Sequence, residues 1–216
     1  MKTSRLLLAV TLLLGNILPA TAADQTATWN STTGNWSDFT KWSTNPNFAN
    51  NGNGGFTFDA IQTGGTVTVN QAITIEKYNL SGGGNVGTGF TLTLNDLMTW
   101  SGGNFNGSGI VNANGGVTFS TGTGKLINSG RVLNLGGTST WSGGDIQYGG
   151  GTIANTAGGV FTTDFGGTIA TFGGTNNFNN AGTFTKNTSS ATTTINIPFN
   201  NTGIVNVDTG TLTSSN

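Results

Sequence analysis

The sequence predicts an all-β protein whose short strands stack as the successive coils of a β-solenoid. Two phrases recur at related distances: Trp-Ser-Gly-Gly occupies residues 100–103 and again 141–144, and Asn-Asn-x-Gly occupies residues 179–182 and again 200–203, at about half that interval. Between such phrases, apolar residues alternate with threonine or asparagine, as in half-buried strands. A period of about 20 residues is typical of β-solenoids, in which each coil buries its apolar side chains against the next.

Residues 1–22 are predicted to form a secretory signal peptide. Lys2 and Arg5 precede an apolar run at residues 6–14, and small residues follow at 20–23, which are the three regions of such a peptide. Cleavage after Ala22 would give a chain exported by the Sec route. Because the apolar run is shorter than the roughly 20 residues that span a bilayer, and no later segment approaches that length, we expect no membrane-spanning segment in the mature chain.

Residues 23–65 are predicted to form an N-terminal cap, because the open ends of a strand stack pair with other chains unless they are covered. Trp29, Trp36 and Trp42 are concentrated here, with several phenylalanines close by. In one interpretation, the tryptophan rings close the end of the core. In the other, they form a flat platform on which a sugar ring stacks, which makes these three residues the candidate glycan-binding site. The sequence favours the first interpretation.

Residues 66–216 are predicted to hold the solenoid repeats, with room for about seven coils and a rod about 35 Å long at the spacing of stacked strands. Glycine-rich segments supply the corners, and Asn179, Asn180, Asn200 and Asn201 are expected at corners, where each bonds its copy in the neighbouring coil. No second cap is evident, so we expect the protein to continue beyond Asn216. The expected strands are residues 65–70, 73–75, 90–94, 109–111, 117–119, 125–127, 132–135, 160–161, 194–197, 204–207 and 211–213. The side chains expected to point inward are Val67, Val69, Ile73, Ile75, Leu80, Leu92, Leu94, Val117, Phe119, Leu126, Val132, Phe161, Phe184, Ile195, Ile197, Val205, Val207 and Leu212.

Composition excludes several classes of function. Without residues 1–22 the chain has five lysines and arginines against eight carboxylates, a net charge of −3, and its cations are scattered, so nucleic acid is not an expected partner. Cysteine and histidine are absent, which removes disulfides, thiol and imidazole catalysis, and soft-metal sites. The calcium-binding nonapeptide repeat is also missing. We therefore expect no cofactor and no metal.

Two chemical alternatives to a structural role remain open. A polysaccharide-cleaving enzyme needs two facing carboxylates, and stacking can place Asp145 and Asp164, which are separated by about one coil of sequence, on neighbouring coils; the favoured interpretation is that both are solvated turn residues. An ice-binding solenoid needs a regular ladder of Thr-x-Thr steps. Such steps occur at residues 66–68, 91–93, 192–194 and 211–213, but their uneven spacing favours the ordinary strand preference of β-branched residues.

Several phrases resemble known bacterial proteins. Residues 29–37 (Trp-Asn-Ser-Thr-Thr-Gly-Asn-Trp-Ser) and 41–43 (Lys-Trp-Ser) resemble the tryptophan-containing opening of many large bacterial surface proteins. Residues 141–144, 178–186 and 197–207 are similar to phrases in the repeat regions of autotransporter-like and other exported β-helical proteins. The resemblance implies a right-handed parallel β-helix that is secreted or displayed on the outer cell surface, and it points to no catalytic residue.

These observations lead to one main functional expectation. We expect a non-enzymatic, secreted or cell-surface structural protein of adhesin type, which presents a Thr/Asn-rich solenoid face to glycans, to other cell-surface components or to matrix. A polysaccharide-active β-helix enzyme or a glycan-binding module is the alternative, and an ice-binding solenoid is the third.

Overall fold

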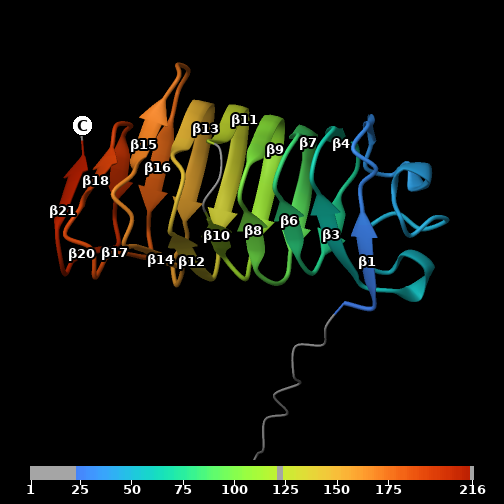
Figure 1. Cartoon of the computed structure of the whole chain (residues 1–216), viewed down its shortest axis with the longest axis horizontal. Helices are drawn as coiled ribbons and strands as arrows, with labels where there is room; N and C mark the ends of the chain where they lie inside the picture. Colours follow the sequence, from blue (N-terminus) through green and yellow to red (C-terminus); the bar gives the residue numbers. More distant parts are fainter. Residues whose placement is uncertain (1–22, 121–123, 215–216) are drawn as a thin grey trace, which may run out of the picture.

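The computed structural model describes residues 23–120 and 124–214, and the predicted signal peptide lies outside the described residues. The chain forms two parallel sheets whose strands lie side by side along the long axis of the molecule (Figure 1). Apart from the isolated antiparallel bridge between Trp29 and Trp42, all strand pairs within the described ranges are parallel. The predicted all-β parallel solenoid is therefore confirmed.

The strands are divided between the two sheets, and two 3-10 helices lie near the start of the chain. The first sheet contains β1 (Gln25–Thr28), β3 (Phe58–Gln62), β6 (Tyr78–Leu80), β8 (Met98–Trp100), β10 (Val117–Phe119), β12 (Thr138–Trp141), β14 (Val160–Thr163), β17 (Thr183–Lys186) and β20 (Ile204–Val207). The second contains β2 (Thr33–Asn35), β4 (Thr66–Val69), β5 (Ile73–Ile75), β7 (Gly84–Leu94), β9 (Gly103–Ala113), β11 (Lys125–Leu135), β13 (Ile146–Asn155), β15 (Thr168–Thr171), β16 (Asn177–Asn180), β18 (Thr192–Ile195), β19 (Phe199–Asn201) and β21 (Thr211–Ser214). The helices are η1 (Phe39–Lys41) and η2 (Asn53–Gly55).

Each strand pairs with the strand that lies one coil later in the chain, which is the defining relation of a solenoid. In the first sheet, Thr118 lies opposite Thr140, and Thr140 lies opposite Thr162. The strands of this sheet therefore mark successive coils. From β6 to β20 they number seven within the described residues, in agreement with the coil count expected from the sequence.

The second sheet forms two of the three straight segments of each coil. Its long strands β7, β9, β11 and β13 contain glycines with positive φ near their middle, at Gly89, Gly109, Gly130 and Gly150, and the registers of β7 with β9 and of β9 with β11 place these bends in one corner. In later coils the two segments are separate strands. Between β15 and β16 the connecting residues protrude from the stack (Figure 1).

An insertion in the first coil covers one end of the core. The register pairs Ala27 with Ala60, and Ala60 with Tyr78, so the chain takes a much longer path from β1 to β3 than from β3 to β6. Residues 36–57 account for the difference. Trp36 and Trp42 in this insertion are 0 and 3 % exposed, and the Trp36 ring lies 5.7 Å from the ring of Tyr78 in a following coil. The rest of the segment 23–65, which was predicted to be the cap, belongs to the stack itself, because β1, β2 and β3 are strands of the two sheets.

The core is a set of ladders with one side chain per coil, and most of the predicted inward positions are confirmed. Leu126 and Val132 are exceptions. Leu126 is half-buried on the outer side of β11, and so is Val132. The register places Ile127 on Phe105 and Leu133 on Val111 of the preceding coil, so alternation sends Ile127 and Leu133 inward and their neighbours Leu126 and Val132 outward. The prediction was wrong because two apolar residues stand next to each other at 126–127 and again at 132–133.

The last coil is less well covered than the others. Val205 and Leu212 pack against the core but are only partly buried. Val207 lies opposite the fully buried Lys186, so it points inward as predicted, but it is 46 % exposed. Its strand, β20, pairs with β17 on one side only within the described ranges, so its side chains lack the cover that a following coil gives elsewhere.

A chain of buried polar side chains crosses the core between distant coils. The Tyr78 hydroxyl donates to Gln62 Oε1, and Asn85 Nδ2 donates to the Tyr78 hydroxyl at 3.3 Å. Arg131 Nη2 donates to Asn85 Oδ1 at 2.9 Å, and Nη1 donates to the Ser108 carbonyl at 3.1 Å. Burial lowers the pKa of Arg131 to about 10, so this fully buried group is still a cation at neutral pH and is held by neutral partners.

Tyr148→Phe is expected to stabilise the protein, whereas Tyr78→Phe is expected to destabilise it. Both side chains are fully buried, but among the described residues the Tyr148 hydroxyl has no hydrogen-bond partner, while the Tyr78 hydroxyl bonds Gln62 and Asn85. An unpaired buried polar group costs about 1–3 kcal/mol. We therefore expect the free energy of unfolding to rise by about that amount for Tyr148→Phe and to fall by a similar amount for Tyr78→Phe. Urea denaturation measures both, and changes of the same sign would contradict this explanation.

Candidate functional site

The outer side of the first sheet carries an uninterrupted column of threonines, one from each of five coils. Thr99 lies opposite Thr118, Thr118 opposite Thr140, Thr140 opposite Thr162, and Thr162 opposite Thr185. We call these five residues the threonine ladder. Their neighbours along each strand are buried, so alternation places the threonine side chains on the outer side of the sheet. At the spacing of stacked strands, the ladder is about 19 Å long.

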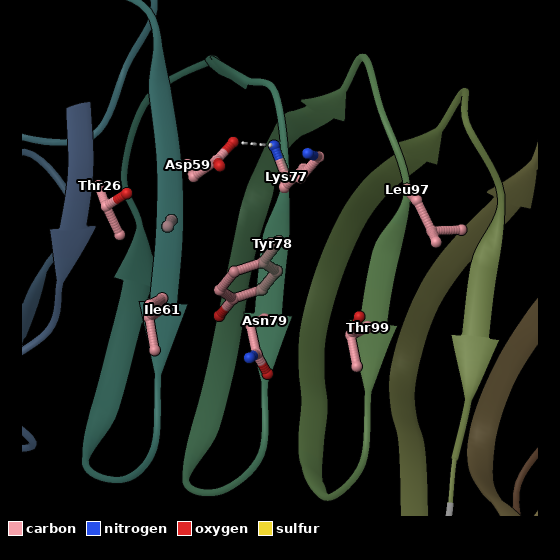
Figure 2. A pocket seen from close by; sticks show the side chains of 9 residues that line it. Thr26, Asp59, Ile61, Lys77, Tyr78, Asn79, Leu97 and Thr99 are labelled. Atoms are coloured by element: carbon pink, nitrogen blue, oxygen red, sulfur yellow. Dashed lines mark hydrogen bonds between the residues drawn. The ribbon is translucent and has the colours of Figure 1, made fainter. Parts of the chain in front are cut away.

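A hollow of about 310 Å³ adjoins the ladder toward the capped end of the same face. Figure 2 shows its side chains on the first coils, and Thr99 belongs both to the hollow and to the ladder. We call it the Asp59 hollow. It is lined by Thr26, Asp59, Ala60, Ile61, Lys77, Tyr78, Asn79, Leu97 and Thr99. Of its apolar residues, Ala60 and Tyr78 are buried in the core, whereas Ile61 and Leu97 are partly exposed.

Asp59 and Lys77 supply the charges of this hollow. The backbone N–H of Lys77 donates to Asp59 Oδ1 at 3.1 Å (Figure 2), and Lys77 Nζ lies 3.5 Å from Asp96 Oδ2. Partial burial raises the pKa of Asp59, and the positive charge of Lys77 opposes this rise. With the Asn79 amide and the apolar side chains beside them, these groups can donate and accept hydrogen bonds while an aliphatic surface is covered. Such a combination suits a ligand with hydroxyl groups on an aliphatic ring.

Asparagines line another outer side, which the second halves of the long strands form. Asn134 Nδ2 donates to Asn112 Oδ1 at 2.9 Å in the preceding coil, and Asn200 Nδ2 donates to Asn179 Oδ1, also at 2.9 Å. The predicted bonding between copies of the same asparagine is therefore confirmed, although Asn179 and Asn200 lie within β16 and β19 and not in the corners. These amides hold neighbouring coils together, which gives this side a structural role.

The three candidate glycan-stacking tryptophans lie inside the capped end. Trp29, Trp36 and Trp42 are 1, 0 and 3 % exposed. Their ring N–H groups donate to the carbonyl oxygens of Thr32, Ala49 and Trp36, at 2.9, 2.6 and 2.7 Å. Because no ring face is open to solvent, the arrangement agrees with sealing of the core and provides no platform for a sugar ring.

Asp145 and Asp164 lie at the same corner of neighbouring coils. Asp145 stands between β12 and β13, and Asp164 stands between β14 and β15, one coil later. Both are exposed, and Asp145 Oδ1 accepts a hydrogen bond from the backbone N–H of Thr168 at 2.9 Å. The bond to Thr168 links Asp145 to the next coil, as expected for a residue that shapes a turn.

The threonine ladder was not predicted from the sequence. The Thr-x-Thr pattern that was considered joins threonines of one strand, whereas the ladder joins threonines of neighbouring strands. The Thr-x-Thr steps at residues 66–68, 91–93, 192–194 and 211–213 all lie on the second sheet. The ladder threonines instead recur once per coil, each in a different local sequence. A search for one residue type at the coil period would have found them.

Comparisons with protein-family models, with curated proteins and with solved structures found no match to this chain. None of the helices within residues 23–120 and 124–214 has the length and apolar character needed to cross a membrane.

Proposed function

We propose that this chain is a non-enzymatic, exported scaffold of adhesin type, displayed at a bacterial cell surface in the manner of autotransporter-like proteins, and that the outer face of its first sheet binds glycans of other cells or matrix. The observation that carries the proposal is the continuity of that face. The Asp59 hollow and the threonine ladder follow one another over the coils of a single rigid stack. The signal-peptide pattern at residues 1–22 supports export.

A repeating ligand suits a repeating surface. Each ladder threonine offers a hydroxyl that can accept a hydrogen bond, next to a methyl group that packs on the aliphatic part of a sugar. The hydroxyl of Thr162 also donates to the Ser139 carbonyl at 3.3 Å. One such contact is weak, since hydrogen bonds exchanged with water contribute only about 0.5–1.5 kcal/mol each. Contacts repeated along a rigid face raise the overall affinity. Once the first sugar is bound, the next sugars of the same chain are held close to the next threonines, so their contacts form within the existing complex. The Asp59 hollow adds charged groups at one end of the face and so sets the direction in which a chain of sugars lies.

The combined substitution Thr118→Val, Thr140→Val and Thr162→Val is expected to weaken glycan binding by about tenfold or more, since three hydroxyls are removed. Valine keeps the β-branched shape, so the strands are preserved. The matched control is Thr74→Val, Thr93→Val and Thr152→Val, which removes three hydroxyls from the second sheet. Binding to a panel of immobilised polysaccharides, measured by biolayer interferometry, gives the comparison. Equal losses for both triple variants, or no glycan bound by the unaltered chain, would contradict the proposal.

Ice binding is the second candidate, because the ladder is a straight row of hydroxyls at a fixed spacing. The neighbouring outer positions on the same strands are mixed, with Thr138, Val160 and Thr183 in three successive coils. This favours a single file of ordered waters over a broad lattice-matched surface, which is why glycan binding ranks first. Thermal hysteresis of the unaltered chain distinguishes ice binding from glycan binding. A measurable difference between the melting and freezing temperatures that Thr140→Tyr abolishes would establish ice binding instead.

A further inference from the structure

The Asp59 hollow lies within the stack, and its central strands have a neighbour on each side. Asp59 and Ile61 belong to β3, Lys77 directly precedes β6, and Asn79 belongs to β6; in the first sheet, β1 and β8 flank these two strands. The register places Ile61 opposite Asn79, and Asn79 opposite Thr99. The column that holds the threonine ladder therefore continues into the hollow, so one extended molecule can contact both.

The Asp59 carboxylate forms no ion pair within residues 23–120 and 124–214. Its Oδ1 accepts a hydrogen bond from the backbone N–H of Lys77 at 3.1 Å, and no other donor of the described residues reaches the carboxylate. The Lys77 ammonium lies 3.5 Å from Asp96 Oδ2, and the Lys77 side chain extends away from Asp59 (Figure 2). Asp59 Oδ2 is therefore open to a donor from a bound molecule.

Partial burial makes this carboxylate selective for a positive charge. The pKa of Asp59 is raised because burial removes water from the carboxylate, and the attraction of Lys77 does not offset this effect. A molecule that enters the hollow removes more of this water. A neutral molecule returns a hydrogen bond, whereas an ammonium group returns a hydrogen bond and the opposite charge.

The walls of the hollow suit a sugar ring better than a simple amine. Ile61 and Leu97 offer aliphatic surface, and the hydroxyls of Thr26 and Thr99 and the amide of Asn79 stand beside it (Figure 2). The volume of 310 Å³ is at the lower end of the range of about 300–1,000 Å³ for ligand pockets, which fits one ring. The alkyl chain of a lysine would cover these polar groups without bonding them, which is unfavourable.

We propose that the Asp59 hollow binds an amino sugar, with the ammonium group on Asp59 and the ring on Ile61 and Leu97, and that this face therefore selects glycans with free amino groups. The assignment rests on the proposed function, because the threonine ladder then holds the following sugars of the same chain. The ladder supplies affinity for glycans in general, and the hollow supplies selectivity among them.

Three hexasaccharides test the role of the charge. Cellohexaose, the hexamer of N-acetylglucosamine and the hexamer of glucosamine share one backbone and differ in one substituent of each ring, which is a hydroxyl, an acetamido or an ammonium group. Isothermal titration calorimetry with the full chain is carried out at about pH 6, between the ordinary pKa ranges of aspartate and of amines. We expect the glucosamine hexamer to bind about tenfold or more tightly than the other two.

Substitutions in the hollow assign this preference to Asp59. Asp59→Asn removes the charge but keeps an oxygen for the Lys77 N–H, and it should reduce the preference to about twofold or less without changing the affinity for cellohexaose. Asp164→Asn is the matched control, because it makes the same change at an exposed carboxylate of a distant coil, and it should keep the preference. Lys77→Gln removes the competing cation and should raise the affinity for the glucosamine hexamer by about threefold or more. Misfolding cannot cause such a gain.

The ladder variant with Thr118→Val, Thr140→Val and Thr162→Val separates the two parts of the face, because it should weaken all three hexamers alike and keep the preference. Equal binding of the three hexamers by the unaltered chain overturns the amino-sugar assignment and leaves the proposed function standing, as do equal effects of Asp59→Asn and Asp164→Asn. Hexalysine that binds as tightly as the glucosamine hexamer also overturns the assignment, since it indicates a protein partner. If no hexamer binds, the assignment fails, and binding to the polysaccharide panel decides the proposed function separately.

Discussion

Gly107→Ala is expected to lower the free energy of unfolding by more than about 4 kcal/mol, or to prevent folding. Gly107 lies in β9, opposite Gly87 in the preceding coil. A β-carbon at this position would lie 2.2 Å from the carbonyl oxygen of Gly87, far inside van der Waals contact. The backbone cannot yield, because hydrogen bonds on both sides hold β9 at the spacing of the stack.

Gly89→Ala is the control that separates this clash from backbone strain. Gly89 lies in β7 and has a φ of 91°, while Gly107 has a φ of 71°, so both adopt a conformation that alanine disfavours. A β-carbon on Gly89 would meet nothing within 4 Å. Its substitution should therefore lower the free energy of unfolding by only about 1–2 kcal/mol, which is the cost of placing alanine in the left-handed conformation. Urea denaturation of both variants gives the difference, and equal losses would mean that coil-on-coil contact does not govern which positions require glycine.

Asn85→Leu is expected to lower the free energy of unfolding by about 3–5 kcal/mol, the usual cost of removing one partner of a buried charge. Asn85 Oδ1 is an acceptor for the Arg131 guanidinium, which is fully buried and has its Cζ 5.5 Å from the ring centre of Phe105. Leucine has a similar volume, so the loss reflects the hydrogen bonds rather than a cavity. The remaining acceptor, the Ser108 carbonyl, cannot replace the bond to Nη2.

The double variant Asn85→Leu with Arg131→Met distinguishes the buried charge from other effects of the substitution. Replacing a buried charged group and its partner by apolar residues is often neutral or stabilising. We expect the double variant to regain most of the stability that Asn85→Leu loses, with a coupling energy of about 2 kcal/mol or more in the double-mutant cycle. Stability that remains as low as that of Asn85→Leu alone would show that Asn85 acts through packing, and not through Arg131.

The coil period was predictable because the same contact is made once per coil, so the same residue types return at the same interval. The Asn-x-Gly corners of two successive coils show why: Asn180 bonds Asn201, and a β-carbon on Gly203 would meet the carbonyl oxygen of Gly182, so both positions are constrained in these coils. The Trp-Ser-Gly-Gly phrases, which lie two coils apart, each make the same local contact within one coil. The ring N–H of Trp100 donates to the Gly103 carbonyl at 3.2 Å, and that of Trp141 donates to the Gly144 carbonyl at 2.8 Å.

The face of each strand was less predictable where two apolar residues stand together. In β11 the local pattern allows either Leu126 or Ile127 to point inward, and only pairing with Phe105 and Tyr148 in the neighbouring coils selects Ile127. That selection carries Lys125 and Arg131 into the core as well. A buried arginine would not be inferred from β11 alone, because its partner Asn85 lies two coils earlier, in β7.

The amino-acid sequence by itself determined that this protein is all-β, that its coils stack at about 20 residues each, and that aromatic residues close its first coil, because repetition and alternation are local properties of the chain. Only the tertiary structure decided that five threonines from separate strands form one ladder beside the Asp59 hollow, and that Asn85 of β7 bonds the buried Arg131 of β11. The physical reason is that register between coils depends on the lengths of the intervening corners. These lengths vary from coil to coil, so which residues become neighbours is settled only when the strands pair.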